Sequence, residues 1–172
     1  MARCDYCEIT KENADAVRIY EDNKVVAILS DKPAAAGHII LMPKEHYPII
    51  EQVPNHIISH LFIVANKLSI SAFEGLNAFG TNILINNGVA AGQTSSHFMV
   101  HIIPRREGDN LNFNWQPKKQ GDDELANIQL LIKEQALGIG NPEHEKTAPA
   151  APKEENTAES EDYLTIALDR IP

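Results

Sequence analysis

The stretch Gly92-Gln93-Thr94-Ser95-Ser96-His97-Phe98-Met99-Val100-His101-Ile102-Ile103-Pro104-Arg105 decides which fold this chain is expected to adopt. Its second half is typical of a β-strand, because it is apolar and β-branched, contains no glycine and is followed by a proline. Side chains on a strand alternate between two faces. One face would carry His97, Met99, His101 and Ile103. The other face would be apolar throughout and belong in a core.

A polar loop with several glycines, asparagines and hydroxyl residues leads into this strand (Asn86, Asn87, Gly88, Gly92, Gln93, Thr94, Ser95). Such a loop can bring backbone N–H groups and hydroxyls to an anion. A half-buried strand with two hydrogen-bonded core histidines fits the same spacing. Two imidazoles alone do not indicate a functional site, because their role depends on the residues that contact them. The rest of the chain must supply those partners.

Composition narrows the classes of function. The chain has 172 residues, of which 43% are hydrophobic, which suits one domain with a sizeable core. Its net charge of −9 disfavours an extended nucleic acid as partner, which needs a basic patch, but allows a local site for a small nucleotide. No apolar run approaches the ~20 residues of a membrane span, and the N-terminus shows no apolar signal region. We therefore expect a cytoplasmic protein without a membrane partner.

The two cysteines, Cys4 and Cys7, form a C-x-x-C pair near the start of the sequence. In a reducing compartment this spacing indicates metal or redox chemistry more often than a structural disulfide. A thioredoxin-like pair follows a strand, and no strand fits before Cys4, so the spacing favours a metal. Two free thiols in a frayed terminus remain the alternative.

Periodicity predicts an α+β order of elements. Strands are expected at 16–20, 24–30, 38–42, 82–86 and 97–103, the first three as a meander. A helix is expected at 54–73, with one apolar stripe, and a second at 122–137. His56 and His60, four residues apart on the first helix, could bind a metal, although a position on the solvent-exposed face of the helix explains them more simply. Residues 141–162 read as a disordered linker, and 163–172 as an apolar peptide that docks on this chain or a partner, or else stays a floppy tail.

In the order and spacing of these features the chain resembles the histidine-triad (HIT) superfamily. The resemblance rests on Gly37-His38, the segment from Met42 to His46, the loop 85–94 and the strand 97–105, and it covers about residues 4–117. It implies a five-stranded antiparallel sheet with one long helix, paired as a homodimer. It implies a nucleotide-binding domain at 1–117 and a site for a purine nucleotide such as AMP or GMP. The resemblance does not reach the C-terminal helical extension at 118–140, which periodicity alone predicts.

The triad of this family is H-x-H-x-H, and its middle histidine attacks an α-phosphate. Here the middle position is Met99, whose thioether is a poor nucleophile and cannot pass a proton. Covalent catalysis is therefore not expected to transfer, although His101 stays a candidate catalytic residue. The resemblance places these residues at the nucleotide: Ser30, Asp31, Asn86, Gly92, Gln93, Thr94, Met99 and His101.

Zinc-bearing branches of the superfamily join an N-terminal C-x-x-C to two histidines. The matching positions are Cys4, Cys7, His46 and His97. Two thiolates and two imidazoles also satisfy tetrahedral Zn²⁺ on their own chemistry. The metal would have a structural role and would attach the N-terminal segment to the sheet.

Three functions follow from this reading. The first is a purine nucleotide-binding protein with a structural zinc and impaired or absent nucleotidyl-histidine chemistry. The second is an active hydrolase or transferase of nucleotide phosphoramidates or dinucleoside polyphosphates, acting through His101 or a bound water. The third is a dimeric interaction platform that works through residues 163–172. We favour the first, because Met99 removes the nucleophile.

Overall fold

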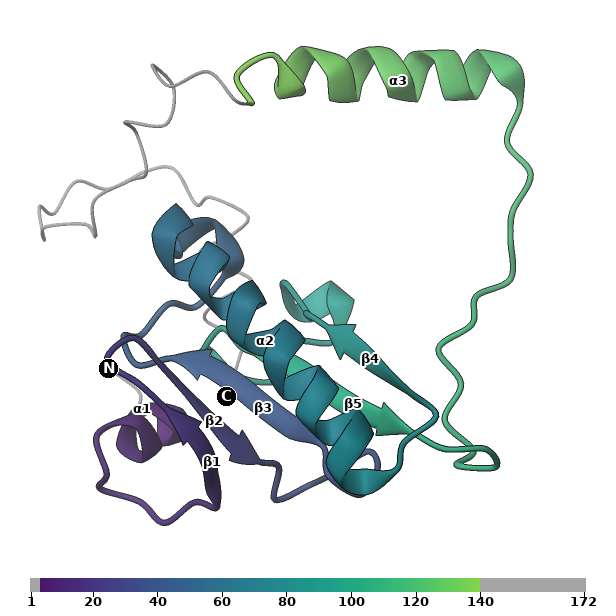
Figure 1. The fold of residues 1–172 in the computed structure, drawn as a ribbon. Helices are drawn as coiled ribbons and strands as arrows, with labels where there is room; N and C mark the ends of the chain where they lie inside the picture. Colours follow the sequence, from purple (N-terminus) through teal and green to yellow (C-terminus); the bar gives the residue numbers. More distant parts are fainter. Residues whose placement is uncertain (1–3, 140–172) are drawn as a thin grey trace, which may run out of the picture. The chain divides into compact units, whose positions relative to one another are not determined.

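A five-stranded antiparallel sheet organises the first part of the chain (Figure 1). The computed structural model describes residues 4–139, which fall into one unit at 4–110 and a second at 111–139, each described by itself. The sheet order is β1-β2-β3-β5-β4. Its strands are β1 (Arg18–Glu21), β2 (Val25–Leu29), β3 (Ile39–Pro43), β4 (Gly80–Leu84) and β5 (Val100–Arg105).

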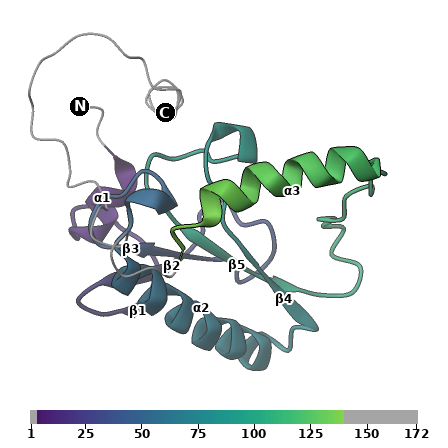
Figure 2. The ribbon, with the colours of Figure 1, turned by 90° about the horizontal axis from the view of Figure 1, so that it is seen from above.

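The helices of this unit lie on opposite sides of the sheet (Figure 2). The long helix α2 (Asn55–Leu76) packs Leu61 and Val64 against the face that carries Phe98, Val100 and Ile102. The short helix α1 (Asp5–Thr10) places Tyr6 and Ile9 on the other face. Two short 3₁₀ turns complete the unit, η1 (Ile50–Gln52) and η2 (Val89–Ala91). The predicted α+β fold, with alternating faces on the last strand, is confirmed.

The last strand begins later than predicted. β5 starts at Val100, not at His97, because the residues before it bond outside the ladder: the N–H of Phe98 donates to the carbonyl of Tyr47 at 2.6 Å. Pro104 does not end the strand either. It pairs with Thr81 of β4, while β3 pairs only as far as Ile102, so the missing N–H of Pro104 leaves no gap in the ladder.

Helix α1 was not predicted from the sequence. With six residues it has little stability of its own, and tertiary contacts hold it. Besides its apolar contacts, its last turn is anchored by Arg18 of β1, whose Nη2 donates to the carbonyl of Ile9 at 2.6 Å. Only the folded chain brings these partners together, which explains why no local pattern indicated the helix.

Helix α2 is longer than predicted and ends at Asn77, which adopts the left-handed conformation typical of a helix C-terminus (φ 49°). Within residues 4–139 it is the one helix long and apolar enough to cross a membrane, a length that the sequence reading did not anticipate. One stripe of it is buried against the sheet (Ile57, Leu61, Val64, Ala65, Ala72). In this fold α2 is therefore a core helix.

The second unit contains helix α3 (Asp122–Ala136), which confirms the second predicted helix. Three acidic residues in its first turn and Lys133 in its last turn suit the helix dipole. Leu130, Leu131 and Ile132 are exposed. The predicted linker at 141–162 and apolar peptide at 163–172 lie outside the described residues. The first unit ends at Asn110, and the domain boundaries drawn from the sequence stay predictions.

Candidate metal centre and nucleotide cleft

The four residues predicted to bind a metal lie together. One ligand atom from each of Cys4, Cys7, His46 and His97 falls within 4.8 Å of the others. Cys7 Sγ lies 3.2 Å from His46 Nδ1 and 3.6 Å from His97 Nδ1, and Cys4 Sγ lies 3.7 Å from His97 Nδ1. They come from the N-terminus, the residues after β3 and the loop before β5.

Local structure positions each thiol. Cys4 immediately precedes α1, and the N–H of Cys7 donates to the Cys4 carbonyl at 3.0 Å, so both sulfurs lie at the start of one helical turn. Tyr6 and Ile9 then fix that turn to the sheet. The Thr10 hydroxyl donates to the Cys7 carbonyl at 3.1 Å. The pair is therefore held by the fold rather than left in a frayed terminus.

The orientation of His97 is set by its second ring nitrogen. Nε2 donates to the carbonyl of Pro43 at 2.9 Å, which leaves the lone pair of Nδ1 facing the two thiols. A backbone carbonyl in this role is a common support for a metal-binding imidazole. The ring is fully buried. Burial lowers the pKa of His97 to about 4, so the imidazole is neutral at pH 7, as a metal ligand must be.

The geometry fits a tetrahedral zinc ion. Bonds of about 2.3 Å to sulfur and about 2.0 Å to nitrogen, at tetrahedral angles, place S and N about 3.5 Å apart. The three measured S···N distances, from 3.2 to 3.7 Å, bracket that value. Burial and the neighbouring Cys4 raise the pKa of Cys7 to about 11, and a divalent cation is the kind of charge that offsets such a rise.

A cleft on the same side of the sheet contains six of the eight predicted nucleotide-binding residues. Its lining consists of Asn86, Gly92, Gln93, Thr94, Ser95, His97, Met99 and His101. The other two, Ser30 and Asp31, are not part of this lining. They follow β2, where the N–H of Ser30 donates to the carbonyl of His38 at 2.9 Å.

Side chains of the loop hold the backbone of the cleft in place. Gln93 Oε1 accepts from the N–H of Gly88 at 2.7 Å, and its Nε2 donates to the carbonyls of Pro48 and Ser95, both at 2.7 Å. Asn86 Nδ2 donates to the carbonyl of Gly92 at 3.2 Å. Gly92 has a φ of 86°, which strongly favours glycine. Asn86 and Gln93 thus serve the site by shaping the loop.

His101 of the cleft contacts a second histidine, His38, which the sequence did not assign to the site. The N–H of Ala34 donates to His38 Nδ1 at 3.1 Å, so the proton of His38 is on Nε2. That Nε2 lies 3.1 Å from His101 Nδ1 and donates to it, which places the proton of His101 on its own Nε2. His101 is thereby oriented as a donor. The histidine of the Gly37-His38 pair was the available signal, but only the fold brings it to His101.

Neutral imidazoles are favoured at both positions. Burial, and then the charge of His101, lower the pKa of His38 to about 4. Burial also lowers the pKa of His101. Met99 lies between the two triad histidines in the sequence and packs against the apolar cluster of Val26, Ile28, Ile40 and Met42. Its thioether has no proton to donate.

The hypothesis of a metal held by His56 and His60 is not supported. Instead, His60 Nε2 lies 2.6 Å from the carboxylate of Asp22 in the β1–β2 turn. The same carboxylate accepts from the backbone N–H groups of Lys24 and Val25. His60 therefore ties this turn to α2.

Comparison with known proteins identifies the family. The HIT domain model matches residues 11–108, more than half of the chain, and the chain belongs to the HIT family. "Adenylylsulfatase HINT3" of Arabidopsis thaliana is 34% identical over 108 residues, which are 63% of this chain and 55% of that protein, so the chain spans about half of it. "Adenosine 5'-monophosphoramidase HNT1" of Candida albicans is 27% identical over 145 residues, 81% of this chain and 95% of that protein.

A solved structure brings the metal centre into the comparison. The Zn-bound histidine triad family protein from Mycobacterium smegmatis is 36% identical, with a TM-score of 0.61, covering 77% of this chain and 96% of that one. Together with the clustered cysteines and histidines, it supports a metal site in this chain.

Proposed function

We propose that this protein binds a purine nucleotide of the AMP or GMP type and lacks the covalent nucleotidyl-histidine chemistry of its family. The observation that carries the proposal is a cleft with its loop and its histidine pair in place, and Met99 where the nucleophile would stand. A phosphate is bound by backbone N–H groups, hydroxyls and an imidazole N–H, none of which requires the missing nucleophile.

The names of the relatives support the class of ligand. The Candida protein is named an adenosine 5'-monophosphoramidase, and the Arabidopsis protein an adenylylsulfatase. Both names point to an adenylate at this fold. We assign the phosphate to the Gly92–Thr94 loop and His101. We assign the ribose to Ser30 and Asp31, whose turn is hydrogen-bonded to the backbone of His38.

The metal in this proposal is zinc with a structural role. All four ligand positions are taken by protein side chains, so the site has no open position for a substrate. Zinc would hold α1 to the sheet and fix His97. His97 then takes no part in phosphate chemistry, and His101 is the remaining triad histidine at the phosphate.

A second copy of this chain is the proposed partner. The order β1-β2-β3-β5-β4 leaves β4 as an edge strand, and large apolar side chains on α2 and β4 remain exposed (Phe62, Ile63, Ile70, Phe73, Ile83). Unpaired edges and exposed apolar faces are typical of association surfaces. A protein partner for residues 163–172 and a cytoplasmic location stay predictions from the sequence.

An active hydrolase is the second candidate. The hydrogen bond between His38 and His101 favours it, because it orients an imidazole that could act on a bound water. In that case no covalent nucleotidyl-enzyme intermediate forms, since no histidine occupies position 99.

The test is turnover of adenosine 5′-phosphoramidate and diadenosine polyphosphates by the wild type, Met99→His and Met99→Leu, with AMP binding measured by calorimetry. We expect AMP binding by all three proteins and turnover by Met99→His alone. Unaided turnover by the wild type, retained in Met99→Leu, would favour the hydrolase. Absence of AMP binding by the wild type would reject the nucleotide-binding proposal.

A further inference from the structure

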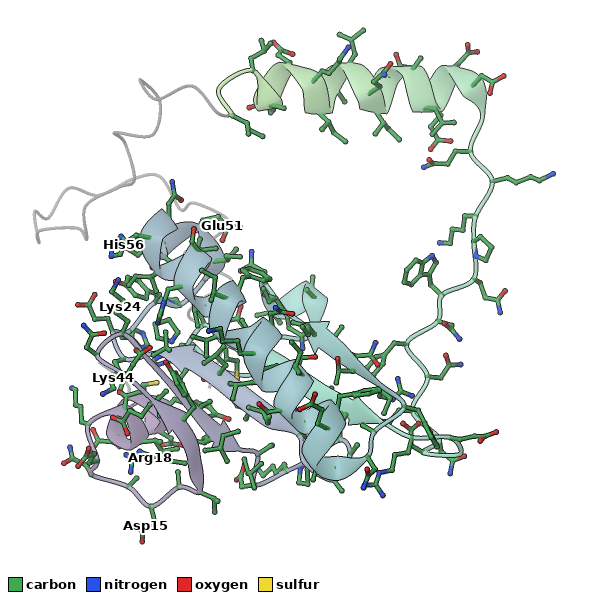
Figure 3. The ribbon with its side chains drawn as sticks, viewed as in Figure 1. Asp15, Arg18, Lys24, Lys44, Glu51 and His56 are labelled. Carbon is green, nitrogen blue, oxygen red and sulfur yellow. The ribbon has the colours of Figure 1, made fainter. Side chains whose placement is uncertain are left out.

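A second cavity, of about 300 Å³, lies where the start of α2 meets the start of β2 and the end of β3. Its walls come from the β1–β2 turn, the end of β3 with the residues that follow, and the first turn of α2. The lining residues are Asn23, Lys24, Pro43, Lys44, Glu45, Tyr47, Pro54, His56 and Ile57. Figure 3 shows Lys24, Lys44 and His56 gathered on one side of the molecule.

This cavity is separate from the nucleotide cleft. Ile57 belongs to the core cluster beneath α2, whereas Met99 of the cleft packs against the cluster on the other face of the sheet. The two linings share no residue. A volume of about 300 Å³ is at the lower end of the range for small-molecule sites.

The charged groups of the cavity lining are two lysines and one glutamate. Lys44 is paired with Glu21 at 2.5 Å, and the carboxylate of Glu45 accepts a hydrogen bond from the Tyr47 hydroxyl. Lys24 has no ion pair with any residue in the described part of the chain. Lys24 is therefore the lysine of this lining that can bind a carboxylate or phosphate without first breaking an ion pair within the described chain.

The wall that carries Lys24 is rigid. The carboxylate of Asp22 accepts from the N–H of Lys24 at 2.7 Å and of Val25 at 2.9 Å, and it bonds to His60 of α2 at 2.6 Å. The N–H of Lys44 donates to the carbonyl of Lys24 at 2.8 Å. Because the backbone is ordered before a ligand arrives, binding costs less conformational entropy.

Besides Asn23 and Glu45, the rest of the lining consists of two prolines, an isoleucine and the ring of Tyr47. We propose that this cavity binds a small organic anion with a flat or apolar body and one carboxylate or phosphate group. The ammonium of Lys24 binds the charged group, with Lys44 and His56 beside it, and the apolar side chains contact the body. This site is independent of the nucleotide site proposed above.

The probe is phenyl phosphate, titrated into the full-length protein as purified and followed by ¹H–¹⁵N NMR. A second titration with benzoate tests a carboxylate in place of the phosphate. We expect saturable shifts at the amides of Asn23, Lys24, Lys44 and His56. Lys24→Gln should weaken binding at least about tenfold, because it removes a charge-assisted hydrogen bond to the ligand. The variant keeps the backbone N–H of residue 24, which donates a hydrogen bond to Asp22 and holds the turn. The matched control is Lys67→Gln, an exposed position elsewhere on α2.

Benzylammonium, with the same ring and the opposite charge, should cause no saturable shift at these amides. Binding of benzylammonium as strongly as phenyl phosphate would overturn the proposal, since the charge would then be irrelevant. Shifts confined to the Gly92–Thr94 loop, or unchanged affinity in Lys24→Gln, would overturn it as well. Saturation by phenyl phosphate but not benzoate would restrict the ligand class to phosphates.

Discussion

His97 and His101 belong to the same sequence motif, but they have different bonding partners. His97 Nε2 donates to a backbone carbonyl, and its Nδ1 faces two thiols. The partner of His101 is another imidazole, and the ring of His101 lines the candidate nucleotide cleft. The comparison shows that partners, more than residue type or spacing, decide what an imidazole does.

The two regions also differ in what supports them. The metal centre combines residues from three separate segments, and no strand or helix joins them directly. The cleft is made by one loop and the strand that follows it, braced by the side chains of Asn86 and Gln93. Loss of the metal should therefore affect stability first, whereas changes in the cleft should affect ligand binding first.

The largest expected effect is at the metal centre. Cys7→Ser should abolish stoichiometric zinc binding and lower the free energy of unfolding by a few kcal/mol. The reason is that a metal bound only by the folded protein stabilises the folded state by its binding free energy. Zinc content by mass spectrometry and thermal unfolding would measure both effects. The exposed His56→Gln variant is the control. Unchanged zinc content in Cys7→Ser would show that Cys7 is not a ligand.

A smaller effect, on affinity rather than stability, is expected in the cleft. His101→Asn should weaken AMP binding about tenfold, since it removes the ring N–H that His38 orients, and should leave the zinc content unchanged. Calorimetry with AMP and metal analysis of the same sample would separate the two regions. A parallel loss of zinc would mean that the regions are coupled, contrary to the comparison drawn above.

A third effect, on stability alone, concerns pH. The pKa of His38 is lowered from 6.5 to about 4 by burial and by His101, so the native state binds fewer protons than the unfolded state between these values. The contribution of neutral His38 to the free energy of unfolding is therefore fully present above pH 6.5 and is lost as the pH drops toward 4. The loss due to this one residue should be on the order of 2 kcal/mol, below the ~3 kcal/mol that the full shift implies, because the protein around a buried charge relaxes to stabilise it in part.

Urea unfolding of the wild type and His38→Asn between pH 7 and pH 4, both with metal, would measure this contribution by difference. Asn keeps an acceptor for the N–H of Ala34, which makes it the matched replacement. Equal pH slopes in the two proteins would contradict the lowered pKa of His38.

Much of the fold could be predicted from local patterns. Alternation along residues 97–103 and the apolar stripe of α2 predicted which faces are buried, because those periods reflect strand and helix geometry directly. The start of α2 was predicted to within one residue, whereas the start of β5, the C-terminal end of α2 and the existence of α1 were not predicted. The start of β5 and the presence of α1 depend on bonds to residues elsewhere in the chain, such as Tyr47 to Phe98 and Arg18 to Ile9.

The sequence by itself determined the family motif, the four positions proposed to bind a metal and the methionine at position 99, since each is a matter of residue identity and order. Only the tertiary structure decided that His38 donates to His101 and that His60 binds Asp22. It also decided that Lys24 lies in a second cavity. Each of these depends on segments 30 or more residues apart approaching within a few ångströms, a distance that chain packing alone sets.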